Sequence, residues 1–131
     1  MKPIVLVIED NEQNLYLATF LLERNGFTVA PARSGPEGIE LAGRIQPDLI
    51  ILDIQLPQMV GYAVARELRL NPDLVEVPVV AVTSYAMVGD RERALEAGCT
   101  GYIEKPINPE TFRSEIETYL KARRAGAETQ P

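Results

Sequence analysis

Short apolar runs alternate with longer, more polar segments along the whole chain. Four runs stand out, at residues 4–8, 49–52, 77–82 and 102–103, and a weaker one spans 27–30. The first three are rich in Val, Ile and Leu and do not alternate with polar residues, which is typical of parallel strands buried on both faces. The pattern predicts five strands in one sheet, with helices covering both of its sides.

The segments between these runs carry the signals of helices. Apolar residues recur at helical spacing between residues 11 and 25, and Gly26 stands where such a helix would end. Ser34 and Glu37 have the spacing of a capping box in front of a second helix. Asn108 is placed to cap the last helix. The predicted helices span residues 11–25, 34–46, 61–70, 87–97 and 108–124.

Five strand–helix units with short connections predict a single α/β domain. Right-handed crossovers between parallel strands lead to a doubly wound sheet. A chain of 131 residues is long enough for one buried core, and no segment is left for a second domain. We expect the domain to cover residues 1–124 and the small, polar residues 125–131 to form a flexible tail.

Composition and charge narrow the function. The net charge is −6 and the basic residues are scattered, which disfavours binding to nucleic acid or to a membrane surface. No apolar run is long enough to cross a bilayer and no cleavage site follows the N-terminus, so we expect a cytoplasmic protein. Cys99 is the only cysteine, expected to be a packing residue, and histidine is absent. Chemistry must therefore rely on carboxylates, hydroxyls and lysine.

Reactive side chains stand at the ends of four predicted strands. Ligands of a parallel sheet bind at the carboxyl ends of its strands, so these side chains can meet in one crevice. Neighbouring carboxylates repel one another unless a cation is bound, and ligation by oxygen alone favours Mg²⁺. A lysine and hydroxyls would add donors for phosphate oxygens. The residues are Glu9, Asp10, Asp53, Thr83, Ser84 and Lys105.

Each of these residues also has a purely structural interpretation. Asp10 or Asn11 could cap the first helix, and Asp53 could cap a turn. Thr83 could be an ordinary β-branched strand residue and Lys105 a solvated lysine. Unrelated surface residues would not, however, be expected to place acids, a hydroxyl and a lysine at four strand ends of one sheet. We therefore favour a functional site.

The same residues, in this order and spacing, resemble the receiver domains of two-component response regulators, which include the CheY- and DivK-like proteins. The resemblance extends over about residues 3–122. It implies a flavodoxin-like (βα)5 fold with a five-stranded parallel sheet in the order 2-1-3-4-5, and a cis Lys105–Pro106 peptide bond. The segments that carry the resemblance are residues 5–11, Asp53 with 56–61, 82–84 and 102–106.

The resemblance also implies a role for each site residue. Asp53 would accept a phosphoryl group, and Thr83 and Lys105 would be the other catalytic residues. The implied ligands of Mg²⁺ are Glu9, Asp10, Asp53 and the main-chain carbonyl of Gln55. The implied phosphate-binding residues are Thr83, Ser84 and Lys105, and the implied switch residues are Thr83 and Tyr102. From the residues alone, Tyr102 is equally well explained as a static core aromatic.

The function that the resemblance implies is a signalling switch and not an enzyme, apart from catalysing its own phosphorylation and slow dephosphorylation. The phosphoryl group would come from a sensor histidine kinase or a histidine phosphotransfer protein. Phosphorylation would change the face made by the fourth helix, fifth strand and fifth helix, which would contact a downstream protein target. The protein would be a monomer or a phosphorylation-dependent dimer.

Three other functions compete with this one. A haloacid dehalogenase-like phosphatase needs a second Asp where Gln55 stands, as well as a cap domain. A flavodoxin-like or Rossmann nucleotide binder needs a Gly- or hydroxyl-rich loop after the first strand, where residues 9–12 read Glu-Asp-Asn-Glu. A pseudo-receiver that is never phosphorylated and acts only through partner contacts shares the sequence pattern and stays open.

Overall fold

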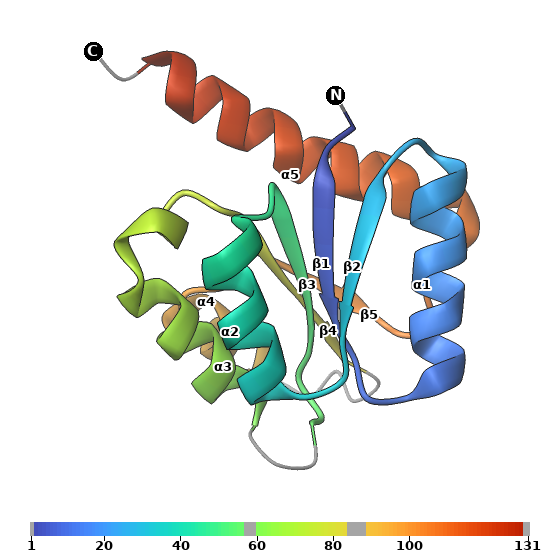
Figure 1. Cartoon of the computed structure of the whole chain (residues 1–131), viewed down its shortest axis with the longest axis horizontal. Coiled ribbons are helices and arrows are strands. Elements are labelled where there is room, and N and C mark those ends of the chain that lie inside the picture. The colour runs from blue at the N-terminus through green and yellow to red at the C-terminus, as the bar shows by residue number, and fades with distance from the viewer. Residues whose placement is uncertain (1, 57–59, 84–88, 130–131) are drawn as a thin grey trace.

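The computed structural model describes residues 2–56, 60–83 and 89–129, with 122–129 as backbone only (Figure 1). Five parallel strands form one sheet in the order β2-β1-β3-β4-β5, as predicted. The predicted order places β1, β3 and β4 inside the sheet, where both of their faces can be covered. The strands are β1 (Ile4–Ile8), β2 (Thr28–Ala32), β3 (Leu49–Asp53), β4 (Val79–Thr83) and β5 (Gly101–Glu104).

Helices cover both faces of this sheet and divide the core into two halves. Val5 and Val7 on β1 belong to the half beneath α1 and α5, whereas Leu6 and Ile8 belong to the half beneath α2, α3 and α4. This alternation follows from the two-residue period of a strand. The helices are α1 (Glu12–Arg24), α2 (Gly35–Ile45), α3 (Gly61–Leu70), α4 (Asp90–Glu96) and α5 (Pro109–Thr129), with a 3-10 helix, η1 (Pro72–Leu74).

The helix ends follow the predicted signals. Asn11 caps α1, because its side-chain oxygen accepts a hydrogen bond from the Asn14 N–H at 2.9 Å. The Ser34 hydroxyl accepts one from the Glu37 N–H at 3.2 Å. Gly26 follows α1 with a φ of +90°, a conformation that favours glycine. The cap of α1 is therefore Asn11, and the neighbouring Asp10 carboxylate is left for another role.

Several boundaries differ from the predictions. Strand β2 runs through Pro31 because it lies at the edge of the sheet, where a proline is tolerated. Helix α4 begins at Asp90, and Met87 and Val88 lie outside the described residues. Helix α5 continues to Thr129, so the predicted end near residue 124 was wrong. Alanines beyond that point favour helix, and extending a helix costs far less than starting one.

Cys99 and Arg69 lie at the end of the sheet opposite the predicted site. Cys99 is 5 % exposed and belongs to the core, and burial raises the pKa of its thiol to about 11, which fits the predicted packing role. The Arg69 side chain donates hydrogen bonds to the loops around it.

Among the described residues, no helix has both the length and the apolar character that a membrane span requires.

Candidate functional site

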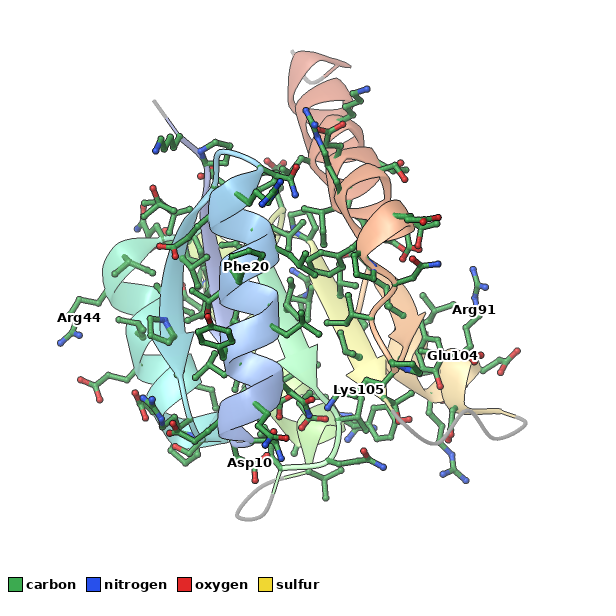
Figure 2. The ribbon with its side chains drawn as sticks, turned by 90° about the vertical axis from the view of Figure 1, so that its right-hand side faces the viewer. Asp10, Phe20, Arg44, Arg91, Glu104 and Lys105 are labelled. Carbon is green, nitrogen blue, oxygen red and sulfur yellow. The ribbon has the colours of Figure 1, made fainter. Side chains whose placement is uncertain are left out.

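Four neighbouring strands bring the predicted site residues to one end of the sheet. Glu9 and Asp10 directly follow β1, Asp53 ends β3, Thr83 ends β4, and Lys105 follows β5. The parallel register aligns these ends, because Ile8 pairs with Leu52 and Thr83 with Glu104. Figure 2 shows Asp10 and Lys105 at this same end of the molecule. The predicted site residues that the structure describes therefore lie together at the carboxyl end of the sheet.

Three carboxylates lie close enough to share one cation. One oxygen from each of Glu9, Asp10 and Asp53 lies within 4.8 Å of the other two. Glu9 and Asp53 are only 5 % and 4 % exposed, whereas Asp10 is exposed. Burial removes the water that would otherwise screen their repulsion. An all-oxygen donor set with one side open to water suits Mg²⁺, so these residues fit the predicted metal.

Lys105 supplies the positive charge within this cluster. Its Nζ lies 2.9 Å from a Glu9 carboxylate oxygen and 3.6 Å from a carboxylate oxygen of Asp53. Its side chain is 13 % exposed, so the contacts are shielded from solvent. The pairing with Glu9 was not predicted, since sequence reasoning treated Glu9 only as a metal ligand and Lys105 only as a phosphate ligand.

Main-chain donors hold the two buried carboxylates in place. The Gln55 N–H donates to an Asp53 carboxylate oxygen at 3.0 Å, and the Asn11 N–H donates to Glu9 at 3.3 Å. Both donors lie two residues beyond the acid that they contact, a local arrangement that follows from the turn after each strand. The predicted role of the Gln55 carbonyl as a metal ligand stays a prediction.

The Glu9 carboxyl has a strongly shifted pKa. Burial is the main cause, a hydrogen bond with Asp53 adds to it and the contact with Lys105 opposes it, and together they raise the pKa from 4.5 to about 7. A proton on Glu9 would remove one of the three negative charges from the cluster. The carboxyl therefore takes up a proton near neutral pH when no metal is bound.

This shift predicts a pH dependence of stability in metal-free buffer. Between about pH 4.5 and pH 7, folded Glu9 keeps a proton that the unfolded chain has released, so the free energy of unfolding should fall as the pH rises. A shift of this size corresponds to about 3 kcal/mol. Urea unfolding in EDTA at pH 5 and pH 8 measures the fall, which Glu9→Gln should reduce. Equal falls in the two proteins would contradict the assignment.

Thr83 and Tyr102, the predicted switch residues, both lie inward. Thr83 is 3 % exposed. Its main-chain carbonyl accepts a hydrogen bond from the Lys105 main-chain N–H at 2.7 Å, which joins the end of β4 to Lys105. The Tyr102 hydroxyl is buried and has no hydrogen-bond partner among the described residues. Ser84 lies outside the described residues. The switching role of Thr83 and Tyr102 stays a prediction.

Sequence reasoning missed one residue that shapes the site. Gly61 begins α3 and lies against the end of the strand that carries Asp53. A Cβ atom at this position would be 2.5 Å from the Cα of Ile54 and 2.8 Å from the Asp53 carbonyl oxygen, so no larger residue fits without moving the backbone. The signal in the sequence was a glycine as the first residue of a predicted helix.

Comparison with known proteins agrees with this geometry. The family model described as response regulator receiver domain matches residues 5–117. The chain is 43% identical over 120 residues to the polar-differentiation response regulator DivK of Brucella ovis, an alignment that covers 92% of this chain and 98% of the relative. The corresponding protein of Brucella anthropi is 42% identical with the same coverage.

Solved structures give the same answer. A CheY-like receiver domain protein from Methanospirillum hungatei superposes with a TM-score of 0.88 at 27% identity, covering 96% of this chain and 99% of that one. The receiver domain of a sensor histidine kinase from Pseudomonas aeruginosa has a TM-score of 0.86 at 30% identity, covering 92% of this chain and 99% of that one. That domain was crystallised with a magnesium ion coordinated in its active site cleft. The chain therefore belongs to the response regulator receiver domains of two-component signalling.

Proposed function

We propose that this receiver domain is a phosphorylation switch in which Asp53 accepts a phosphoryl group with the help of Mg²⁺. The observation that carries the proposal is the grouping of Glu9, Asp10 and Asp53 within 4.8 Å, with Lys105 paired to Glu9 and Asp53. Such a cluster is costly in a metal-free fold and is explained by a bound cation and a phosphoryl group. The Pseudomonas aeruginosa relative, which holds magnesium in its cleft, supports the choice of metal.

The proposed donor is a phospho-histidine on a sensor histidine kinase or a histidine phosphotransfer protein. An Asp53 carboxylate oxygen attacks phosphorus, the new O–P bond forms, and the P–N bond breaks with its electron pair returning to the imidazole. When bound, Mg²⁺ neutralises charge on the phosphoryl oxygens. The product is an acyl phosphate, which water slowly hydrolyses, so the only reactions catalysed are the domain's own phosphorylation and dephosphorylation.

The residues around Asp53 divide this work. Glu9, Asp10, Asp53 and the Gln55 carbonyl would hold the metal. With Mg²⁺ held there, Glu9 would no longer need its 2.9 Å contact with the Lys105 ammonium, which would then be able to bind phosphoryl oxygens. The Gln55 N–H keeps its hold on Asp53 and fixes the direction of the nucleophile. Thr83 and Ser84 would add hydroxyl donors for the phosphoryl oxygens.

The proposed output begins at Thr83 and Tyr102. Movement of the Thr83 hydroxyl toward a phosphoryl oxygen would change the packing next to Tyr102 and thereby the surface of α4, β5 and α5. A downstream protein target would bind that surface in one state better than in the other. A coupling of about 1–3 kcal/mol is typical of such switches. We place this cycle in the cytoplasm, with the domain as a monomer or a phosphorylation-dependent dimer.

Intact mass spectrometry tests the proposal directly. After incubation with Mg²⁺ and acetyl phosphate, a small phosphodonor, the protein should gain the mass of a single phosphoryl group. EDTA should prevent the gain, and hydroxylamine, which cleaves acyl phosphates, should reverse it. No gain in mass, together with no binding of Mg²⁺, would instead support a pseudo-receiver that acts only through contacts with its partners.

A further inference from the structure

Tyr62, in the first turn of α3, links this helix to the first turn of α4. The residue before it, Gly61, packs against the backbone of Asp53 and Ile54 and donates its N–H to the Ile54 carbonyl at 3.0 Å. The Tyr62 hydroxyl donates a hydrogen bond to the Asp90 carbonyl at 3.4 Å. Asp90 is the first residue of α4. Of two consecutive residues of α3, Gly61 therefore contacts the end of β3 that carries Asp53, and Tyr62 contacts α4.

Among the residues that the structure describes, no side chain caps the N-terminal end of α4. This helix has seven residues, and Gly89, its N-terminal cap, has a φ of +92° and makes no side-chain hydrogen bond to the helix. A helix this short, without a capping side chain, depends on contacts with other elements. The bond from Tyr62 on α3 is one such contact, so the position of the α4 first turn depends in part on α3.

The negative charge of Asp90 acts on both Tyr62 and Tyr102. Burial raises the pKa of both Tyr62 and Tyr102, and the charge of Asp90 is the second cause for each of them. Both rings are partly buried and pack against the same half of the core. A buried hydroxyl without a hydrogen-bond partner is unfavourable, so the inward position of Tyr102 depends on the neighbours that enclose it.

We propose that Tyr62 is a positioning residue that, with Gly61, joins the phosphoacceptor end of β3 to the first turn of α4. This link runs through α3 and is separate from the one expected through Thr83. In the unphosphorylated chain it holds α4 in the arrangement seen here. Its part in transmitting phosphorylation rests on the function proposed for Asp53.

Hydrogen exchange measured by mass spectrometry tests this link, with Tyr62→Phe removing the hydroxyl and leaving the ring. Tyr16→Phe is the matched control, because Tyr16 is 73% exposed on α1 and stacks on Phe20. Without a phosphodonor, we expect peptides covering α4 to exchange roughly threefold faster in Tyr62→Phe than in wild type, the effect of one weak hydrogen bond. Peptides from α1, and all peptides of Tyr16→Phe, should be unchanged.

The same exchange is then measured after incubation with Mg²⁺ and acetyl phosphate. Tyr62→Phe should gain a phosphoryl group to the same extent as wild type, but the phosphorylation-dependent change of exchange in α4 should fall to less than half. If exchange in α4 matches wild type in both conditions, or if it rises equally in α1, the proposed link is wrong. If wild type gains no phosphoryl group, the proposed function fails, and the measurement without phosphodonor still decides on the link.

Discussion

Replacing Asp53 with asparagine is expected to abolish phosphoryl acceptance and, in metal-free buffer, to make the protein more stable. The amide is not a carboxylate nucleophile, so the mass gain with Mg²⁺ and acetyl phosphate should disappear. The same change removes a charge that is 4 % exposed and close to Glu9 and Asp10. Glu9 and Asp53 share one lysine and Asp10 lies close to both, so losing the Asp53 charge relieves more repulsion than it loses attraction, by about 1–2 kcal/mol.

Both effects are measured on the same protein. Intact mass reports acceptance, and urea unfolding in EDTA reports stability. Mg²⁺ should stabilise wild type much more than Asp53→Asn, because a charged ligand has been lost. Asp73→Asn is the matched control, since Asp73 lies exposed on η1 at the other end of the sheet. An unchanged mass gain would mean that another residue is the acceptor, and a less stable metal-free variant would mean that pairing with Lys105 outweighs repulsion.

The strand ends were predictable because a parallel sheet places them by rule. Once the apolar runs at 4–8, 49–52 and 77–82 are identified as parallel strands, the residues that follow them must lie at the carboxyl end of the sheet. Strand identity places Glu9, Asp10 and Asp53 at the same end of the sheet, and the adjacency of β1 and β3 brings them together. The strand order itself came from resemblance to the family and not from the spacing of the runs, and the structure confirms it.

Side-chain contacts between distant segments were not predictable in this way. The ion pair of Glu9 and Lys105 joins residues 96 positions apart, and nothing in the local sequence of either residue indicates it. The hydrogen bond from Tyr62 to Asp90 has the same character. A helical period places Tyr62 near the start of a helix, but its partner depends on how two helices pack on the sheet. The shifted pKa of Glu9 likewise depends on burial, which the sequence does not give.

Arg69 is the residue of largest structural consequence that the sequence did not reveal, and replacing it with methionine is expected to destabilise the fold by about 3–4 kcal/mol. Its guanidinium donates to the carbonyls of Gly98 at 2.7 Å and of Leu74 and Val77 at 2.8 Å. It also donates to the Thr100 hydroxyl at 3.2 Å. These acceptors lie in the segments that lead into β4 and β5, so one side chain joins both loops to α3.

Methionine fills similar space but leaves these carbonyls without their charged donor, whose hydrogen bonds are worth about 1.5–3 kcal/mol each. Lysine keeps the charge but lacks the planar arrangement of donors, so Arg69→Lys should recover less than half of the loss.

Arg66→Met, at an exposed position of the same helix, is the matched control and should stay within about 0.5 kcal/mol of wild type. Urea unfolding in Mg²⁺ buffer measures all three. Equal stability of Arg69→Met and Arg66→Met would mean that water replaces the guanidinium without cost. A large difference would show that Arg69 holds the N-terminal ends of β4 and β5, at the end of the sheet opposite Asp53. A residue that takes no part in phosphorylation would then stabilise the two strands whose other ends lie at the site.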